Sequence, residues 1–166
     1  MLRIRKAEPK DAALVHAFVC ELAEYERLSH EVAASQEDIA AALFAPAARV
    51  FCDIAEWNGE PAGFALWFYN FSTFRGRCGI YLEDLFVRPD HRGRGMGKAL
   101  LANLASRCRA EGLARLDWAV LDWNAPSIVF YESLGARPQS DWIVYRLTGE
   151  PLAALADAKE NQACSS

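Results

Sequence analysis

Three glycines and three basic residues share one short stretch of the chain, Arg92-Gly93-Arg94-Gly95-Met96-Gly97-Lys98. Positions without a side chain let backbone N–H groups approach a ligand closely. The helix predicted after this turn adds unpaired N–H groups and the positive end of its dipole, which together bind anions. Residues 88–109 carry six Lys or Arg against one Asp, in a chain whose net charge is −4. The turn is therefore predicted to hold a phosphate-bearing ligand.

Two common phosphate-binding motifs do not fit this stretch. The Walker A loop, G-x-x-x-x-G-K-[ST], requires a hydroxyl residue after the lysine, whereas Ala99 follows Lys98. The dinucleotide fingerprint G-x-G-x-x-G has a different glycine spacing and opens a chain-initial β-α-β unit, which this sequence lacks. A nucleoside triphosphatase of the Walker type and a Rossmann dehydrogenase are both excluded.

Short apolar elements must position the turn. A strand over 80–87 precedes it, and a helix over 96–110 follows, with Leu100, Leu101, Leu104 and Cys108 as its buried stripe. The dipeptide Asn58-Gly59 predicts a β-hairpin between strands at 50–55 and 63–69. The other predicted elements are a strand at 3–6, a helix from Asp11, a helix capped by Ser35, a polar loop at 72–79, a strand at 113–121, a helix at 127–133 and a strand at 142–147. This order predicts an α/β (α+β) domain with a mixed, mostly antiparallel sheet.

The composition bounds the class of protein. The chain has 166 residues, of which 52% are apolar and 24% charged, as expected for one domain (residues 1–150) with a C-terminal tail (residues 151–166). The longest apolar stretch, Pro61–Tyr69, is half of the ~18 residues that cross a bilayer. The N-terminus alternates apolar and basic residues, unlike a secretory signal. We expect a cytoplasmic protein that binds neither membranes nor nucleic acid.

The spacing of the cysteines and histidines fits neither a disulfide framework nor a metal site. The five cysteines are odd in number and widely separated, which favours reduced thiols: Cys20, Cys52, Cys78, Cys108 and Cys164. The three histidines are equally scattered, so no metal site is expected.

The stretch Arg92–Gly97 resembles the [RQ]-x-x-G-x-[GA] motif of the GNAT acetyltransferases, which bind acetyl-coenzyme A. The resemblance runs from about Ile4 to Leu147 and implies a twisted sheet with helices on both faces. Within the family the chain is similar to the diamine (spermidine/spermine) and thialysine N-ε-acetyltransferases. The matching segments are Glu21–Glu26, Tyr81–Asp84, Trp123-Asn124 and Phe130-Tyr131. The segments Ser72–Arg77 and Ala119–Asn124 resemble the thialysine branch more closely, and Ser72 stands where the polyamine branch has an acidic residue.

The resemblance implies the cofactor site. The motif residues Arg92, Gly93, Arg94, Gly95, Met96, Gly97 and Lys98 are expected at the pyrophosphate. The backbone of Leu85, Phe86 and Val87 is expected to pair with the pantetheine arm like an added strand. Asn124, Ser127 and Tyr131 are further expected cofactor contacts, although Asn124 would also serve as a helix N-cap.

Acetyl transfer to an amine requires a proton acceptor, because an alkylamine has a pKa near ~10.4 and is protonated at neutral pH. Glu83 and Asp84 are adjacent carboxylates, of which one would accept the proton through water while the other attracts the cationic substrate. Neighbours on a regular strand face opposite sides, so both reach the site only through a bulge or an edge. The resemblance adds Glu26 as an amine-binding residue.

The resemblance implies Tyr131 as the general acid that protonates the coenzyme A thiolate, although a tyrosine in a short amphipathic helix is, taken alone, more often a packing residue. No cysteine lies at the expected acetyl position, which favours direct transfer over a covalent acyl-enzyme. The sequence leaves two alternatives open: acetylation of a protein or peptide amine, and a coenzyme A-binding regulatory module without turnover. The resemblance also implies a homodimer.

Overall fold

The computed structural model describes residues 1–163, with side chains to residue 157. The chain forms two compact units, Met1–Trp123 and the segment from Asn124 onward, which are described separately. Cys164 and the end of the predicted tail lie outside the described residues. The predicted domain boundary at residue 150 stays a prediction.

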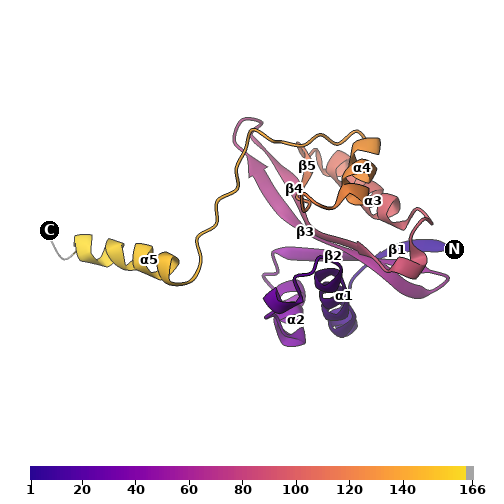
Figure 1. Ribbon diagram of the computed structural model, residues 1–166, viewed down its shortest axis with the longest axis horizontal. Coiled ribbons are helices and arrows are strands. Elements are labelled where there is room, and N and C mark those ends of the chain that lie inside the picture. Colours follow the sequence, from indigo (N-terminus) through magenta and orange to yellow (C-terminus); the bar gives the residue numbers. More distant parts are fainter. Residues whose placement is uncertain (164–166) are drawn as a thin grey trace. The chain divides into compact units, whose positions relative to one another are not determined.

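The first unit is built on a five-stranded sheet of order β1-β2-β3-β4-β5. The strands are β1 (Leu2–Lys6), β2 (Val50–Trp57), β3 (Glu60–Ser72), β4 (Arg77–Val87) and β5 (Leu116–Trp118). All neighbours are antiparallel except β4 and β5, which are parallel. Figure 1 shows α1 (Ala12–Tyr25) and α2 (Gln36–Phe44) on one face of the sheet and α3 (Met96–Glu111) on the other. The predicted fold class is confirmed.

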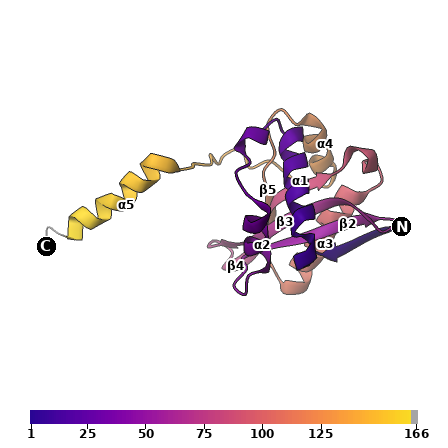
Figure 2. The same cartoon turned by 90° about the horizontal axis from the view of Figure 1, so that it is seen from below.

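The core of this unit lies between α1, α2 and the sheet. The predicted apolar stripe of α1 buries Val15, Phe18 and Leu22, and the Phe18 ring stacks on Phe64 of β3 at 5.3 Å. Helix α2 begins where the sequence predicts, because Ser35 and Asp38 form a reciprocal capping box. Figure 2 shows the same layers from below.

The turn between β2 and β3 confirms the hairpin predicted from Asn58-Gly59. Asn58 has φ 54° and Gly59 has φ 89°. Positive φ at both central positions is the requirement of a type I′ turn. The polar segment 72–79, predicted as a loop, is only half loop: the turn is confined to Thr73–Gly76, and β3 and β4 continue up to it on either side.

Two predictions about the C-terminal half are wrong. The strand predicted over 113–121 is reduced to the three residues of β5. The segment Trp142–Leu147, predicted as a strand, forms none and is exposed, since a segment of this kind makes a strand only where a partner edge is available. The predicted tail contains most of the helix α5 (Gly149–Ala163), whose Ala, Leu and Lys residues have high helix propensity.

Three short 3₁₀ helices complete the described elements: η1 (Pro9–Asp11), η2 (Ser29–Glu31) and η3 (Pro89–His91). The second unit contains α4 (Ala125–Ser133) and α5. None of the helices within residues 1–163 has the length and apolar character needed to span a membrane.

Candidate active site

Strand β4 has an open edge along its second half. One edge pairs with β3 over the whole strand, from Arg77 to Val87. The other edge pairs with β5 only at Ile80–Leu82, so Glu83–Val87 has no strand partner there in the described part of the chain. The predicted pantetheine-binding residues Leu85, Phe86 and Val87 all lie in this open segment. An extended ligand can add to such an edge as a strand does.

A β-bulge interrupts β4 beside the open edge. Leu66 of β3 pairs with Asp84, and the next residue, Trp67, pairs with Leu82. Glu83 is therefore the extra, unpaired residue of the bulge. Bulges redirect side chains and often occur beside active sites. The structure thus supplies the irregularity that two adjacent carboxylates require if both are to serve one site.

Glu26, Glu83 and Asp84 form a carboxylate cluster at the bulge. Burial, together with the negative charges of Glu83 and Glu26, raises the pKa of Asp84 to about 7. Burial also raises the pKa of Glu26, which lies at the C-terminal end of α1. A carboxyl group whose pKa is raised by burial and by neighbouring negative charges favours a bound ammonium group, because the cation compensates the repulsion. Glu26 and Glu83 both lie near enough to Asp84 for their charges to raise its pKa.

The glycine-rich turn joins β4 to α3 through positive backbone angles. Gly93 has φ 74° and Gly95, the N-cap of α3, has φ 78°. No atom lies within 4 Å of a Cβ built at either position, so backbone conformation rather than crowding requires glycine there. The first helical bond of α3 runs from the Ala99 N–H to the Gly95 carbonyl. The N–H groups of residues 96–98 precede that bond and are the donors that helix N-termini offer to anions.

The two arginines of the turn contact protein groups. Arg92 donates from Nε to the Val87 carbonyl at 2.9 Å, and its guanidinium lies 4.6 Å from the Tyr25 ring centroid. Arg94 lies over the Trp57 ring at 5.3 Å. Met96 is buried, so only its backbone faces the turn. The exposed Lys98 side chain and the backbone N–H groups are therefore the main candidates for a pyrophosphate. Sequence reasoning missed Tyr25 and Trp57 as partners of the arginines, since nothing local marks them.

The remaining predicted residues belong to the second unit. Asn124 is the N-cap of α4, and its side-chain oxygen accepts from the Ser127 N–H at 3.4 Å. The N-cap role given for Asn124 is confirmed. Tyr131 lies on α4, half-buried, with its ring 5.4 Å from that of Phe130. The expected meeting of Tyr131 with Glu83 and the cofactor stays a prediction.

An ion pair fixes the end of β4 to α1. Arg88 donates to both carboxylate oxygens of Glu21, at 2.6 and 2.9 Å, and to the Pro61 carbonyl at 3.1 Å. Its guanidinium also lies 4.7 Å from the Phe18 ring centroid. The bidentate geometry holds the strand immediately before the glycine-rich turn.

Replacing Arg88 with Ala is expected to lower the free energy of unfolding by about 1–3 kcal/mol, because a charge-assisted pair and a stacking contact are lost together. Urea unfolding followed by circular dichroism measures the change. The exposed Arg109→Ala on α3 is the matched control, expected to change stability by less than about 0.5 kcal/mol. Equal effects of the two variants would contradict the role of the Arg88 pair.

Comparison with known proteins places the chain in a family. The acetyltransferase (GNAT) family pattern matches residues 14–136, which include the carboxylate cluster, the open edge, the glycine-rich turn and α4. The chain therefore belongs to the acetyltransferase (GNAT) family, whose members take their acetyl group from acetyl-coenzyme A. It is an N-acetyltransferase by class.

Individual relatives refine this assignment. The chain is 36% identical to a thialysine N-epsilon-acetyltransferase of Bos taurus, over 92% of this chain and 96% of that protein. It is 30% identical to an L-ornithine N5-acetyltransferase of Arabidopsis thaliana, over 92% and 87% of the two chains. Among solved structures, an integron cassette protein of V. cholerae superposes with a TM-score of 0.78 at 28% identity, over 93% of this chain and 97% of that one. The resemblance inferred from the sequence motifs is confirmed.

Proposed function

We propose that this enzyme transfers the acetyl group of acetyl-coenzyme A directly to a primary amine of a small cationic molecule, such as thialysine, a diamine or a polyamine-like compound. One observation carries the proposal: two features lie next to each other on β4. The first is the open edge that leads to the glycine-rich turn, and the second is the bulge beside which the carboxylate cluster lies. The edge and turn suit an extended pyrophosphate ligand, and the cluster suits an ammonium group.

In the proposed reaction the ammonium group binds among Glu26, Glu83 and Asp84. Glu83 accepts one proton through water, and the neutral nitrogen attacks the thioester carbonyl carbon. The tetrahedral intermediate then collapses, the carbon–sulfur bond breaks and coenzyme A leaves as a thiolate. The Tyr131 hydroxyl supplies the proton that converts this thiolate to a thiol. The nitrogen, which after its attack still carries one proton more than the amide product, releases that proton through water and restores the Tyr131 hydroxyl. The backbone N–H groups around residues 94–98 hold the pyrophosphate throughout.

Two relatives support a small acceptor with a terminal amine. Their names specify the ε-nitrogen of thialysine and the N5 nitrogen of ornithine. A panel of thialysine, ornithine, diamines, polyamines and a lysine-containing peptide, with free thiol detected and products weighed by mass spectrometry, tests the proposal. Turnover of a small amine supports it, and turnover of the peptide alone favours the protein-amine alternative. Binding of acetyl-coenzyme A without turnover of any amine favours the regulatory module.

The variant Tyr131→Phe is expected to lower kcat by about 100-fold, since general acid catalysis typically contributes that much or more. The KM for acetyl-coenzyme A should change little, because the ring remains. The neighbouring Phe130→Leu changes packing but removes no hydroxyl, and is expected to keep kcat within about threefold. Full turnover by Tyr131→Phe would remove the proposed acid.

We also propose a cytoplasmic homodimer. The four described cysteines are free thiols, as a reducing compartment favours. The segment Trp142–Leu147 is apolar except for Arg146 and is exposed, which suits an edge that pairs with a second copy. Analytical ultracentrifugation is expected to give twice the chain mass of 18.5 kDa, and a monomer at micromolar concentration would contradict the dimer.

A further inference from the structure

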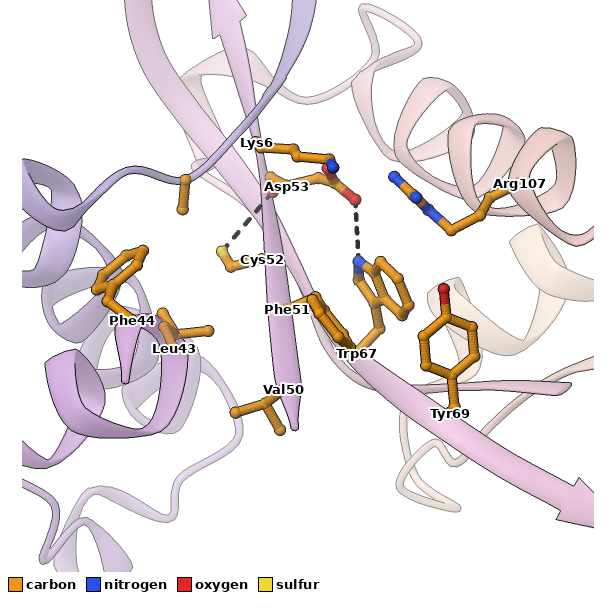
Figure 3. Close-up of a pocket in the computed structure, with 11 residues that line it drawn as sticks. Lys6, Leu43, Phe44, Val50, Phe51, Cys52, Asp53, Trp67, Tyr69 and Arg107 are labelled. Carbon is orange, nitrogen blue, oxygen red and sulfur yellow. Dashed lines mark hydrogen bonds between the residues drawn. The ribbon is translucent and has the colours of Figure 1, made fainter. Parts of the chain in front are cut away.

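A pocket of about 240 Å³ lies where β1 ends beside β2, between α2 and α3. Figure 3 shows the residues that line it. They include no member of the carboxylate cluster or of the glycine-rich turn. The volume is below the range of roughly 300–1,000 Å³ that accommodates drug-sized ligands. The pocket is therefore suited to a small molecule and is separate from the proposed acetyl-transfer site.

One wall of the pocket carries a buried carboxylate. Asp53 is only 3% exposed, and its Oδ2 accepts a hydrogen bond from the Trp67 indole nitrogen at 2.9 Å. Burial raises the pKa of Asp53, while the positive charges of Arg107 and Lys6 oppose that shift. Among the described residues Asp53 forms no ion pair, although Figure 3 shows the Lys6 amine on the same side of the pocket. The Asp53 carboxylate can therefore accept further hydrogen bonds from a ligand in the pocket.

The opposite wall carries a guanidinium with an unused donor. Arg107 of α3 lies over the Trp67 ring at 4.9 Å and reaches Glu111 through Nη1 at 3.4 Å. Its Nε is buried without a hydrogen-bond partner. A buried donor without an acceptor is costly, so this N–H would gain from an acceptor placed in the pocket. Figure 3 shows Asp53 and Arg107 pointing toward each other across the indole of Trp67.

We propose that this pocket binds a small zwitterion with an apolar body, such as a free α-amino acid. The ligand's ammonium group binds Asp53 and its carboxylate binds Arg107, while its apolar part lies against Phe51. The positive charges of Lys6 and Arg107 would repel a ligand that carries only a positive charge, and the buried Asp53 would repel a ligand that carries only a negative charge. Only a ligand with both charges satisfies both walls. This inference does not depend on the proposed acetyl-transfer chemistry.

The test uses L-leucine as the zwitterion, L-leucinamide as its cationic counterpart and N-acetyl-L-leucine as its anionic one. Each is titrated into ¹⁵N-labelled full-length protein, and the Trp67 indole N–H resonance, assigned with Trp67→Phe, is followed. L-leucine is expected to shift this resonance saturably and to bind at least about tenfold more tightly than the other two probes. Equal binding of all three probes, or no shift at millimolar concentration, would overturn the proposal.

Single variants test the contribution of each charged wall to ligand binding. Asp53→Asn keeps an acceptor for Trp67, and Arg107→Gln removes the guanidinium; each is expected to weaken L-leucine binding by about tenfold or more. Arg109→Gln, on the exposed side of the same helix, is the matched control and should leave binding unchanged. Glu83→Gln should also keep the Trp67 shift, because its change lies in the other site. Retained affinity in both Asp53→Asn and Arg107→Gln would assign L-leucine to a different place.

Discussion

Glu83→Gln is expected to lower kcat/KM for the amine by at least about 100-fold, because a general base contributes about 10²–10⁴ to the rate. Glutamine retains the size of the side chain and its hydrogen-bonding oxygen, but it cannot accept the proton. Glu83 is the exposed extra residue of the β4 bulge, so the melting temperature should stay the same. Steady-state thiol release with a saturating acceptor measures the loss.

The control for this prediction is Glu60→Gln. Glu60 is an equally exposed glutamate at the start of β3, outside the carboxylate cluster. It is expected to keep wild-type turnover. If Glu83→Gln retains more than about a third of wild-type kcat/KM, Glu83 does not accept the proton, and Asp84 becomes the acceptor.

Asp84→Asn is expected to change both the pH profile and the stability. Since the pKa of Asp84 is raised to about 7, the ionised form gains population as the pH rises through neutrality. Wild-type kcat/KM should therefore rise between about pH 6 and 8. In Asp84→Asn this rise should be missing, and the KM for the amine at pH 8 should increase by about tenfold, because one attracting charge is lost.

The stability change has a defined sign. A carboxyl whose folded pKa exceeds its unfolded value of 3.8 destabilises the fold increasingly between that value and about pH 7. The full penalty above pH 7 amounts to at most about 4 kcal/mol. Asp84→Asn should thus raise the melting temperature by several degrees at pH 8 and by less at pH 5. A lower melting temperature at pH 8 would show that Asp84 stabilises the fold, contrary to this account.

The turn and its flanking elements could be predicted because their signals are local. Glycine spacing, the strand before Pro89 and the stripe of α3 each occupy a few consecutive residues. The capping box of α2 and the Asn58-Gly59 hairpin are local in the same sense. Local backbone preferences and one apolar face determine such elements without distant partners.

The bulge at Glu83 could not be predicted, because it arises from the register of β4 against residues 66 and 67 of β3. Register depends on two segments that are far apart in sequence. The strand prediction for Trp142–Leu147 is wrong for a related reason: its β-branched and aromatic residues are those of a strand, but strand formation requires a pairing edge. The stacking of Arg92 on Tyr25 also joins residues 67 positions apart, and no local pattern marks it.

The most direct test of the account is a crystal structure of the protein with acetyl-coenzyme A. The account predicts pyrophosphate oxygens about 2.7–3.2 Å from backbone nitrogens of residues 94–98, with the pantetheine amides paired to the open edge at Leu85–Val87. A pyrophosphate bound away from the glycine-rich turn would contradict it.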